Sequence, residues 1–295
     1  MHIDKSQVKV WHACTDGYRW FLDKFPQGGT YADVHGALIS DKRYDDARWL
    51  VDQMYRTFLD SAEFIQAETA ATDKMVGELT SMEQPSDQVA EGENSSGDDA
   101  RIGSSGDDAR IGSSGDDAQI GSSGDDARIG SSGNYARIGS SGDDAQIGSS
   151  GDDARIGSSG DDARIGSSGD DARIGSSGDD ARIGSSGNYA QIGSSGNYAR
   201  IGSSGDDAQI GSSGDDAQIG SSGDDARITA TGKGSVVACA GSIERIVLGE
   251  GGCASVPWHD GKRIRIAVAY VGENGIEANI PYYVNDEGQF VRVED

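Results

Sequence analysis

The sequence is poor in the residues that build ordinary hydrophobic cores and disulfide frameworks. Its 295 residues include only five Phe, four Trp, four Pro and three Cys. The cysteines, Cys14, Cys239 and Cys253, are odd in number and far apart, which argues against a disulfide framework. The sequence also lacks an apolar run near the ~20 residues that span a membrane, and its start lacks the apolar stretch of a secretory signal. We therefore expect a cytoplasmic protein that does not bind a membrane.

The charge balance is strongly negative, with a formal net charge of -25. This charge argues against nucleic acid as a partner and favours basic proteins or cations. Low hydrophobicity combined with high charge usually indicates disorder. Here, however, the 45 glycines and many of the aspartates recur at a strict interval. A regular interval indicates a repeat architecture instead.

Residues 94–228 contain fifteen copies of a nonapeptide, G-[DN]-[DY]-A-[RQ]-I followed by G-S-S. A helix is excluded because glycine occupies two of every nine positions and costs a helix ~1 kcal/mol at each. A short strand followed by a turn fits better. Ala100 and Ile102 are two residues apart and share one face of that strand, while Arg101 points to the other. We expect the Gly-Ser-Ser-Gly segment to form the corner, with glycine adopting a positive φ.

One nonapeptide is too short to close a coil around its own core, whereas two copies place two strands across an Ala/Ile interior. The expected fold class is therefore mainly β, a two-sided β-solenoid with 18 residues per coil. Coils spaced ~4.8 Å apart would make the fifteen copies a rod of roughly 36 Å. The nine-residue interval continues to Val237 and Ile246, so the solenoid is expected to extend past the regular repeats.

The segment before the repeats has the apolar spacing of helices. One helix is expected over residues 13–25, a second begins at Thr30 with Asp33 as a capping residue, and a third begins near Tyr44. The apolar stripe of the third helix consists of Trp49, Leu50, Met54, Phe58 and Leu59. From Ser61 the pattern becomes polar and rich in alanine.

The domain organisation that follows has four parts. Residues 1–80 form a helical module, 81–93 an acidic linker, 94–246 the solenoid, and 247–295 a β-rich cap. Within the cap, the alternation of Ile264, Ile266, Val268 and Tyr270 predicts a half-buried strand, and residues 282–284 and 290–293 predict a hairpin.

The variable positions of the repeat separate structural residues from candidate contact residues. The first acidic position is only Asp or Asn, which indicates a structural Asx turn at a buried or half-buried corner. The second is Asp or Tyr and must point outward, as must the Arg/Gln position. The candidate partner-contact residues are Asp99, Arg101, Asp108, Arg110, Asp126, Arg128, Tyr135, Arg137, Tyr189, Tyr198 and Arg200.

Counting residues along the coil shows which of these candidates share a side of the rod. Tyr135 and Tyr189 are 54 residues apart, which is three coils, so they lie on one side and Tyr198 lies on the other. The scatter of Gln among the Arg positions follows no such parity. The sequence therefore does not select a functional face.

Calcium is one alternative for the repeat. The secreted calcium-binding nonapeptides have the pattern G-G-x-G-x-D-x-U-x, where U is apolar, and Gly103, Gly106 and Asp108 fit it. Ser104 and Arg110 do not, and the apolar positions are shifted by one residue. We expect no cofactor, and a calcium-stabilised structural rod stays open as an alternative.

Catalytic and metal-binding signals are weak elsewhere. Cys253, His259 and Asp260 are close in sequence, but neighbouring residues rarely orient as a triad. His12, Cys14 and His35 lack the spacing of metal ligands. We therefore expect that the protein is not an enzyme.

The electrostatics of the repeats suggest a second hypothesis. The fifteen copies contain 24 Asp and ten Arg, a net charge of -14. Duplex DNA carries one charge per ~1.7 Å, so ~36 Å of DNA carries about 21 charges. The rod then resembles DNA in charge density and acts as a decoy for a DNA-binding protein. The competing interpretation is that acidic charge keeps a repetitive rod soluble.

The whole chain resembles uncharacterised proteins of phages and prophages of proteobacteria. The resemblance is carried by the ACTDGYRWFLDKFPQGGTY start, the GSSGDDARI array and the HDGKRIRIAVAYVGENGI segment near the end. It implies a phage context, with either inhibition of a host defence protein or a minor role in phage assembly. The implied partner is a host or phage protein, and the acidic charge favours a basic or DNA-binding one. The oligomeric state stays open, with the N-terminal helices or an end of the solenoid as the surfaces for an oligomer.

Overall fold

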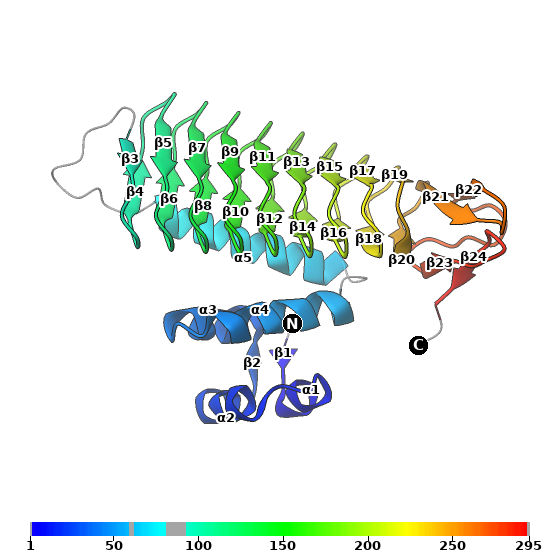
Figure 1. Cartoon of the computed structure of the whole chain (residues 1–295), viewed down its shortest axis with the longest axis horizontal. Helices are drawn as coiled ribbons and strands as arrows, with labels where there is room; N and C mark the ends of the chain where they lie inside the picture. Colours follow the sequence, from blue (N-terminus) through cyan, green and yellow to red (C-terminus); the bar gives the residue numbers. More distant parts are fainter. Residues whose placement is uncertain (1, 59–61, 81–92, 294–295) are drawn as a thin grey trace. The chain divides into compact units, whose positions relative to one another are not determined.

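The structure is a computed structural model that describes residues 2–58, 62–80 and 93–293 (Figure 1). The chain divides into two compact units, Met1–Ala67 and Glu68–Asp295. The predicted acidic linker lies outside the described residues, apart from its last residue, Glu93. Within the described ranges, no helix is long and apolar enough to cross a membrane.

The first unit is helical, as the sequence predicted. Helices α2 (Thr15–Lys24), α3 (Tyr31–Ser40) and α4 (Tyr44–Phe58) lie where the apolar spacing placed them, although Leu59 of the predicted stripe lies outside the described residues. The cap of α3 is confirmed: the Thr30 hydroxyl accepts a hydrogen bond from the Asp33 backbone N–H at 3.2 Å. Phe21, Val34, Leu50 and Met54 are among the buried residues of this unit.

The sequence missed two elements of this unit. Helix α1 (Lys5–Val10) has only six residues, and a capping box between Asp4 and Gln7 starts it. Strands β1 (His2–Ile3) and β2 (Gly29–Thr30) form a two-residue antiparallel ladder. Elements this short have too few residues to show an apolar period.

Helix α5 (Ala62–Thr80) connects the two units. Its Phe64 is buried with the helical core, and residues 68–80 belong to the solenoid unit. The alanine-rich pattern from Ser61 therefore belongs to a helix whose second half packs on the repeats, an arrangement that the sequence did not predict.

The repeats form a β-solenoid of two parallel sheets, which confirms the predicted fold class (Figure 1). Each strand pairs with the strand 18 residues away, as Ile156 does with Ile174 and Ile165 with Ile183. Two nonapeptides per coil are therefore confirmed. Successive nonapeptides alternate between the two sheets, which we call sheet I and sheet II.

The repeat strands of sheet I are β4 (Arg101–Ser104), β6 (Gln119–Ser122), β8 (Arg137–Ser140), β10 (Arg155–Ser158), β12 (Arg173–Ser176), β14 (Gln191–Ser194), β16 (Gln209–Ser212) and β18 (Ala226–Ala230). Those of sheet II are β3 (Glu93–Ser95), β5 (Arg110–Ser113), β7 (Arg128–Ser131), β9 (Gln146–Ser149), β11 (Arg164–Ser167), β13 (Arg182–Ser185), β15 (Arg200–Ser203) and β17 (Gln218–Ser221).

The solenoid interior consists of three side chains per nonapeptide. In one copy these are Ala163, Ile165 and Ser167, which are 0%, 4% and 7% exposed. The alanine and isoleucine were predicted to point inward, whereas the serine was assigned to the corner. Its inward position follows from the strand alternation, since Ser167 is two residues after Ile165.

The corners differ from the prediction in where the positive φ lies. All fifteen residues at the second acidic position have φ between 54° and 58°, whereas the corner glycines do not have positive φ. The corner glycine is needed for a close backbone approach: a Cβ on Gly160 would lie 2.5 Å from the carbonyl carbon of Gly142 in the preceding coil. The prediction of a left-handed glycine was therefore wrong.

The solenoid continues past the array, as predicted. Val237 of β19 (Val236–Cys239) pairs with Ile219, and Ile246 of β20 (Ile243–Leu248) pairs with Ile228. Strand β21 (Cys253–His259) adds one more parallel strand to sheet II. The predicted hairpin is confirmed as β23 (Pro281–Val284) and β24 (Phe290–Arg292), which lie at the end of sheet I.

Strand β22 (Ile264–Tyr270) closes sheet II antiparallel to β21. Its alternation was predicted correctly, but the wrong face was assigned to the interior. Ala267 and Ala269 are buried, whereas Ile264, Ile266, Val268 and Tyr270 point outward and are between 51% and 71% exposed. The pairing of β22 with β21 therefore places the alanines inside and the larger apolar residues outside.

Candidate functional site

The first acidic residue of each repeat joins neighbouring coils. The backbone N–H of Asp179 donates to Oδ1 of Asp161 at 2.8 Å, and the N–H of Asp161 donates to Oδ1 of Asp143 at 2.9 Å. A second bond runs the other way, from the N–H of Asp144 to the carbonyl of Asp161 at 3.0 Å. The position is structural, as predicted, but the predicted local Asx turn is wrong, and the side chains are exposed.

The hydrogen bonds from each backbone N–H to Oδ1 of the preceding coil form a ladder along the corner. This ladder explains why only Asp and Asn occupy the first position. Both residues carry an Oδ1 acceptor at the same place, and Asn134 accepts from the N–H of Asp152 at 2.9 Å in the same way. The negative charge is therefore not required for this hydrogen bond.

We expect Asp161→Asn to leave the free energy of unfolding unchanged, because the amide oxygen still accepts from Asp179. Asp161→Ala removes the acceptor and is expected to cost about 1 kcal/mol. Urea unfolding of both variants measures the difference. An equal loss in both would mean that the charge, and not the acceptor, stabilises the corner.

The second acidic residue lies at the left-handed position of each corner and is exposed in most copies, while Asp117, Asp153, Asp171 and Asp207 are only partly exposed. Asp99, Asp108 and Asp126 are exposed, and Tyr135, Tyr189 and Tyr198 are 41%, 49% and 55% exposed. The left-handed backbone accounts for the absence of β-branched residues here, because Asp and Asn adopt this region more readily. The outward direction of this position is as predicted.

The two sheets divide the candidate residues between two faces. Arg101, Asp99, Arg137, Tyr135 and Tyr189 belong to copies of sheet I, while Arg110, Asp108, Arg128, Asp126, Arg200 and Tyr198 belong to copies of sheet II. The candidate contact residues therefore form two separate groups, one on each sheet. On each sheet the outward face has a row of Arg or Gln next to a row of glycine.

Helix α5 covers the glycine row of sheet I. A Cβ on Gly139 would lie 3.1 Å from Leu79 Cδ1, one on Gly157 2.8 Å from Val76 Cγ2, and one on Gly175 2.5 Å from Thr72 Oγ1. The second half of α5, which belongs to the solenoid unit, lies along this side of the solenoid (Figure 1). The bare glycine surface is what allows the helix to approach so closely.

A hydrogen bond reinforces this contact. The Ser177 hydroxyl donates to Oδ1 of Asp73 at 2.7 Å. Burial raises the pKa of the Asp73 carboxyl above its usual value, and the bond from Ser177 partly opposes that rise. Packing against the repeats therefore removes part of the water around this carboxyl, which disfavours its charged form.

Sheet II has the same outward pattern, but among the described residues no helix lies against its glycine row. For Gly130, Gly148, Gly166, Gly184 and Gly202, an added Cβ would meet no atom within 4 Å among the described residues. The arginines of this sheet, Arg110, Arg128, Arg164, Arg182 and Arg200, are all exposed. On sheet I only Arg101, at the first repeat strand, is exposed among the arginines, while Arg137, Arg155, Arg173 and Arg227 are partly exposed. The structure therefore distinguishes a covered face from an open face.

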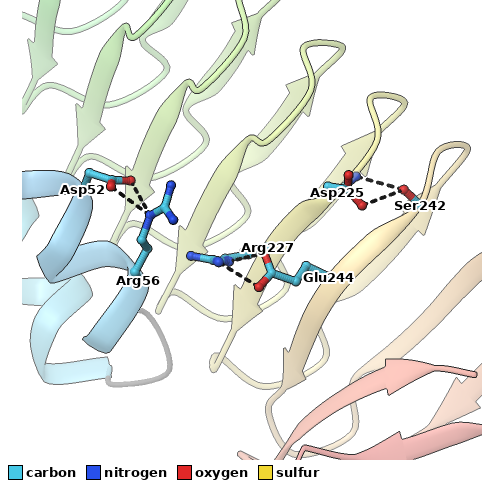
Figure 2. Close-up of polar contacts among 6 residues, drawn as sticks. All are labelled: Asp52, Arg56, Asp225, Arg227, Ser242 and Glu244. Carbon is cyan, nitrogen blue, oxygen red and sulfur yellow. Dashed lines mark hydrogen bonds and ion pairs between the residues drawn. The ribbon is translucent and has the colours of Figure 1, made fainter. Parts of the chain in front are cut away.

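At the C-terminal end of the array, side chains that do not occur in the regular repeats join neighbouring strands. Figure 2 shows Arg227 of β18 paired with Glu244 of β20 through two hydrogen bonds of 2.6 and 2.7 Å. Next to this pair, the Ser242 hydroxyl accepts from the backbone N–H of Asp225 at 2.9 Å. The hydrogen bond of the first acidic position continues here, from the Ser242 N–H to Oδ1 of Asp224 at 2.9 Å, whereas the Ser242 hydroxyl takes the place of the carbonyl oxygen that accepts the second corner bond in the regular repeats.

The residues considered for catalysis do not form a site. Cys253 and His259 lie at opposite ends of β21, a separation of roughly 20 Å for an extended strand. Asp260 caps the β21–β22 turn, and bonds from the backbone N–H groups of Arg263 and Lys262 and from Arg265 lower its pKa to about 2. Burial raises the pKa of the Cys239 thiol to about 12, so this thiol is unreactive at neutral pH.

The other candidates also lack a shared geometry. In the described part of the chain, no group of three or more His, Cys, Asp and Glu side chains is arranged to hold a metal ion. The helical unit contains a cavity of about 180 Å³ lined mainly by apolar residues, with Cys14 and Asp46 at its wall. Asp46 pairs with Arg43 at 2.6 Å, which makes it part of the helical fold.

Comparison with known proteins identifies one part of the chain. Residues 1–59 match the YdhT N-terminal domain family. The uncharacterized protein YdhT of Escherichia coli (strain K12) is 36% identical over 75 residues, which cover 25% of this chain and 28% of that protein. The YdhT-like domain thus includes helices α1 to α4.

The repeats have a different relative. Two ice nucleation proteins of Pseudomonas syringae are each 58% identical over 36 residues, 12% of this chain and 3% of their own length. This chain therefore spans only a small fraction of these relatives. No solved structure matches the chain. The comparisons support a YdhT-like domain and a repeat similarity, and they do not bear on the phage resemblance.

Proposed function

We propose that this protein is a non-enzymatic interaction protein whose acidic solenoid is its binding surface. The observation that carries the proposal is that the two acidic positions at each corner have different roles. The first acidic residue accepts the hydrogen bonds that join the coils, while the second, at the left-handed position of the corner, is exposed in most copies, as at Asp108 and Asp162. The exposed carboxylates at this second position form the charged surface that we propose binds the partner.

The charge pattern favours a basic partner. The array carries a net charge of -14 over roughly 36 Å, about one charge per 2.6 Å, which approaches the density of duplex DNA. Such a field attracts positively charged surfaces and raises their rate of association. Together with the phage resemblance, it leads us to a decoy that binds a DNA-binding host protein in the cytoplasm of an infected cell.

A variant that removes this charge and keeps the fold tests the proposal. Twelve copies carry Asp at the second position, and all twelve are replaced by Asn. Asn suits the left-handed backbone at these sites, so the solenoid is expected to fold. Circular dichroism and thermal unfolding verify this before binding is measured.

Capture from a host lysate is then compared between the wild type and the Asn variant. We expect the wild type to retain DNA-binding proteins that added duplex DNA displaces, and the variant to retain at least tenfold less, a difference of about 1.4 kcal/mol. Equal capture by both forms would contradict the electrostatic proposal, as would capture that duplex DNA leaves unchanged.

A further inference from the structure

The two sheets present the same outward surface because the same nonapeptide builds both. On sheet I the glycine row holds α5, whose Thr72, Val76 and Leu79 lie against glycines from Gly121 to Gly175. On sheet II the equivalent row forms a shallow groove lined by residues that include Gly166, Gly184, Gly202, Gly220 and Ala238. Within the described part of the chain, one version of this surface therefore holds a helix and the other does not.

The match between helix and groove has a geometric basis. Coils repeat every ~4.8 Å, while a helix rises ~5.4 Å per turn. Residues four and three apart, such as Thr72, Val76 and Leu79, therefore meet successive glycines. Any helix with small or branched side chains at this spacing fits the same row.

A second observation points to an occupant of sheet II. Its outward face ends in exposed apolar residues, with Val236 of β19 at 46% and the outward side chains of β22 at 51% to 71%. Across the three strands, Val236 pairs with Cys253, and Cys253 pairs with Tyr270. In the neighbouring row, Ala238 pairs with Ser255, and Ser255 pairs with Val268. By the same register Ala238 pairs with Gly220, so the apolar patch continues the glycine groove. Contiguous exposed apolar residues of this kind mark interaction sites.

We propose that the outward face of sheet II, from Gly130 to the apolar patch on β19 and β22, binds an amphipathic helix of a partner protein. The helix places small or branched residues over the glycines and larger apolar residues on the patch. Its acidic residues lie beside the exposed arginines of sheet II. This inference rests on the proposed function in that it gives an interaction protein a specific docking face.

Charge complementarity favours a partner helix over a second copy of this chain. Five exposed arginines flank the groove, so two sheet II faces packed together would bring rows of like charge into contact. Helix α5 of each copy already lies on its own sheet I. The sequence of α5 has four acidic residues and one lysine, so its charge is opposite in sign to that of the arginine row on sheet II.

The probe is a fluorescent synthetic peptide with the sequence of residues 62–80, titrated with the full chain and followed by anisotropy. The blocking variant carries Gly166→Leu, Gly184→Leu and Gly202→Leu, where the structure leaves space for a side chain. A second variant, Ile266→Glu, changes only the apolar patch. The peptide with Val76→Glu serves as the control ligand.

We expect the wild type to bind the peptide and both protein variants to bind it at least tenfold more weakly, with unchanged thermal unfolding. The control peptide is expected not to bind. No binding by the wild type, or equal binding by the blocking variant, would overturn the proposal. So would a wild-type dimer in sedimentation that the blocking variant abolishes, since this would assign the face to a second copy.

The twelve-Asn variant separates this inference from the proposed function. If it loses lysate capture and still binds the peptide, both proposals stand. If lysate capture is independent of charge while the blocking variant loses the peptide, the electrostatic proposal fails and the docking face stands. Loss of peptide binding in the twelve-Asn variant would instead show that the corners hold the peptide, and would overturn the docking face.

Discussion

Gly160→Ala is expected to lower the free energy of unfolding of the solenoid by about 3 kcal/mol, the upper end of the usual cost of overpacking. The added Cβ would lie 2.5 Å from the carbonyl carbon of Gly142, and that atom belongs to the backbone of the preceding coil. The coils hold one another through backbone hydrogen bonds at this corner, so neither chain segment moves without breaking them. Relieving the clash would therefore break hydrogen bonds between the coils.

The matched control is Gly166→Ala, six residues along the same nonapeptide. Its Cβ would meet no described atom within 4 Å, and its φ is not positive. We expect a small gain of about 0.4–1 kcal/mol, because alanine restricts the unfolded chain. Urea unfolding of the two variants measures the difference, and equal effects at both sites would show that close approach is not the role of the corner glycine.

Gly157→Val is expected to detach the second half of α5 from sheet I while the solenoid stays folded. The new Cβ would lie 2.8 Å from Val76 Cγ2 and also too close to Thr72, so the helix must lift away. The hydrogen bond between Ser177 and Asp73 is expected to be lost with it. Hydrogen exchange in residues 72–79 is expected to accelerate at least tenfold, which corresponds to about 1.4 kcal/mol.

Gly184→Val provides the control on the open face. The residue has the same place in the nonapeptide and no described neighbour within 4 Å of its Cβ. Valine is favoured in strands, so stability is expected to stay equal or rise slightly. If α5 exchanges equally fast in both variants, the glycine row is not what seats the helix.

The coil itself could be predicted from the sequence because its inward face and its length follow from the alternation and the period within the repeats. Ala and Ile two residues apart define an inward face, and a nine-residue period with two copies per coil leads to the 18-residue register of Ile156 and Ile174. The extension to Val237 and Ile246 followed from the same interval. These features depend on local alternation and period alone.

The corner chemistry could be predicted only in part. The restriction to Asp or Asn indicated a structural role, but the partner of Asp161 is Asp179, a residue in the next coil. The glycine was understood as a conformational residue, whereas the clash that it avoids is with Gly142, again in another coil. A single repeat contains no information about what the neighbouring coil places against it.

The sequence by itself determined the solenoid, its coil length and which positions point outward. Only the tertiary structure decided that the two outward faces differ, because the repeats that build them are nearly identical. The difference comes from α5, which covers Gly121 to Gly175 on sheet I, while the arginines of sheet II are exposed and no described residue lies over its glycines from Gly130 to Gly202. Likewise, the outward position of Ile266 and Val268 follows from how β22 closes the rod, since alternation defines two faces and only packing selects the buried one.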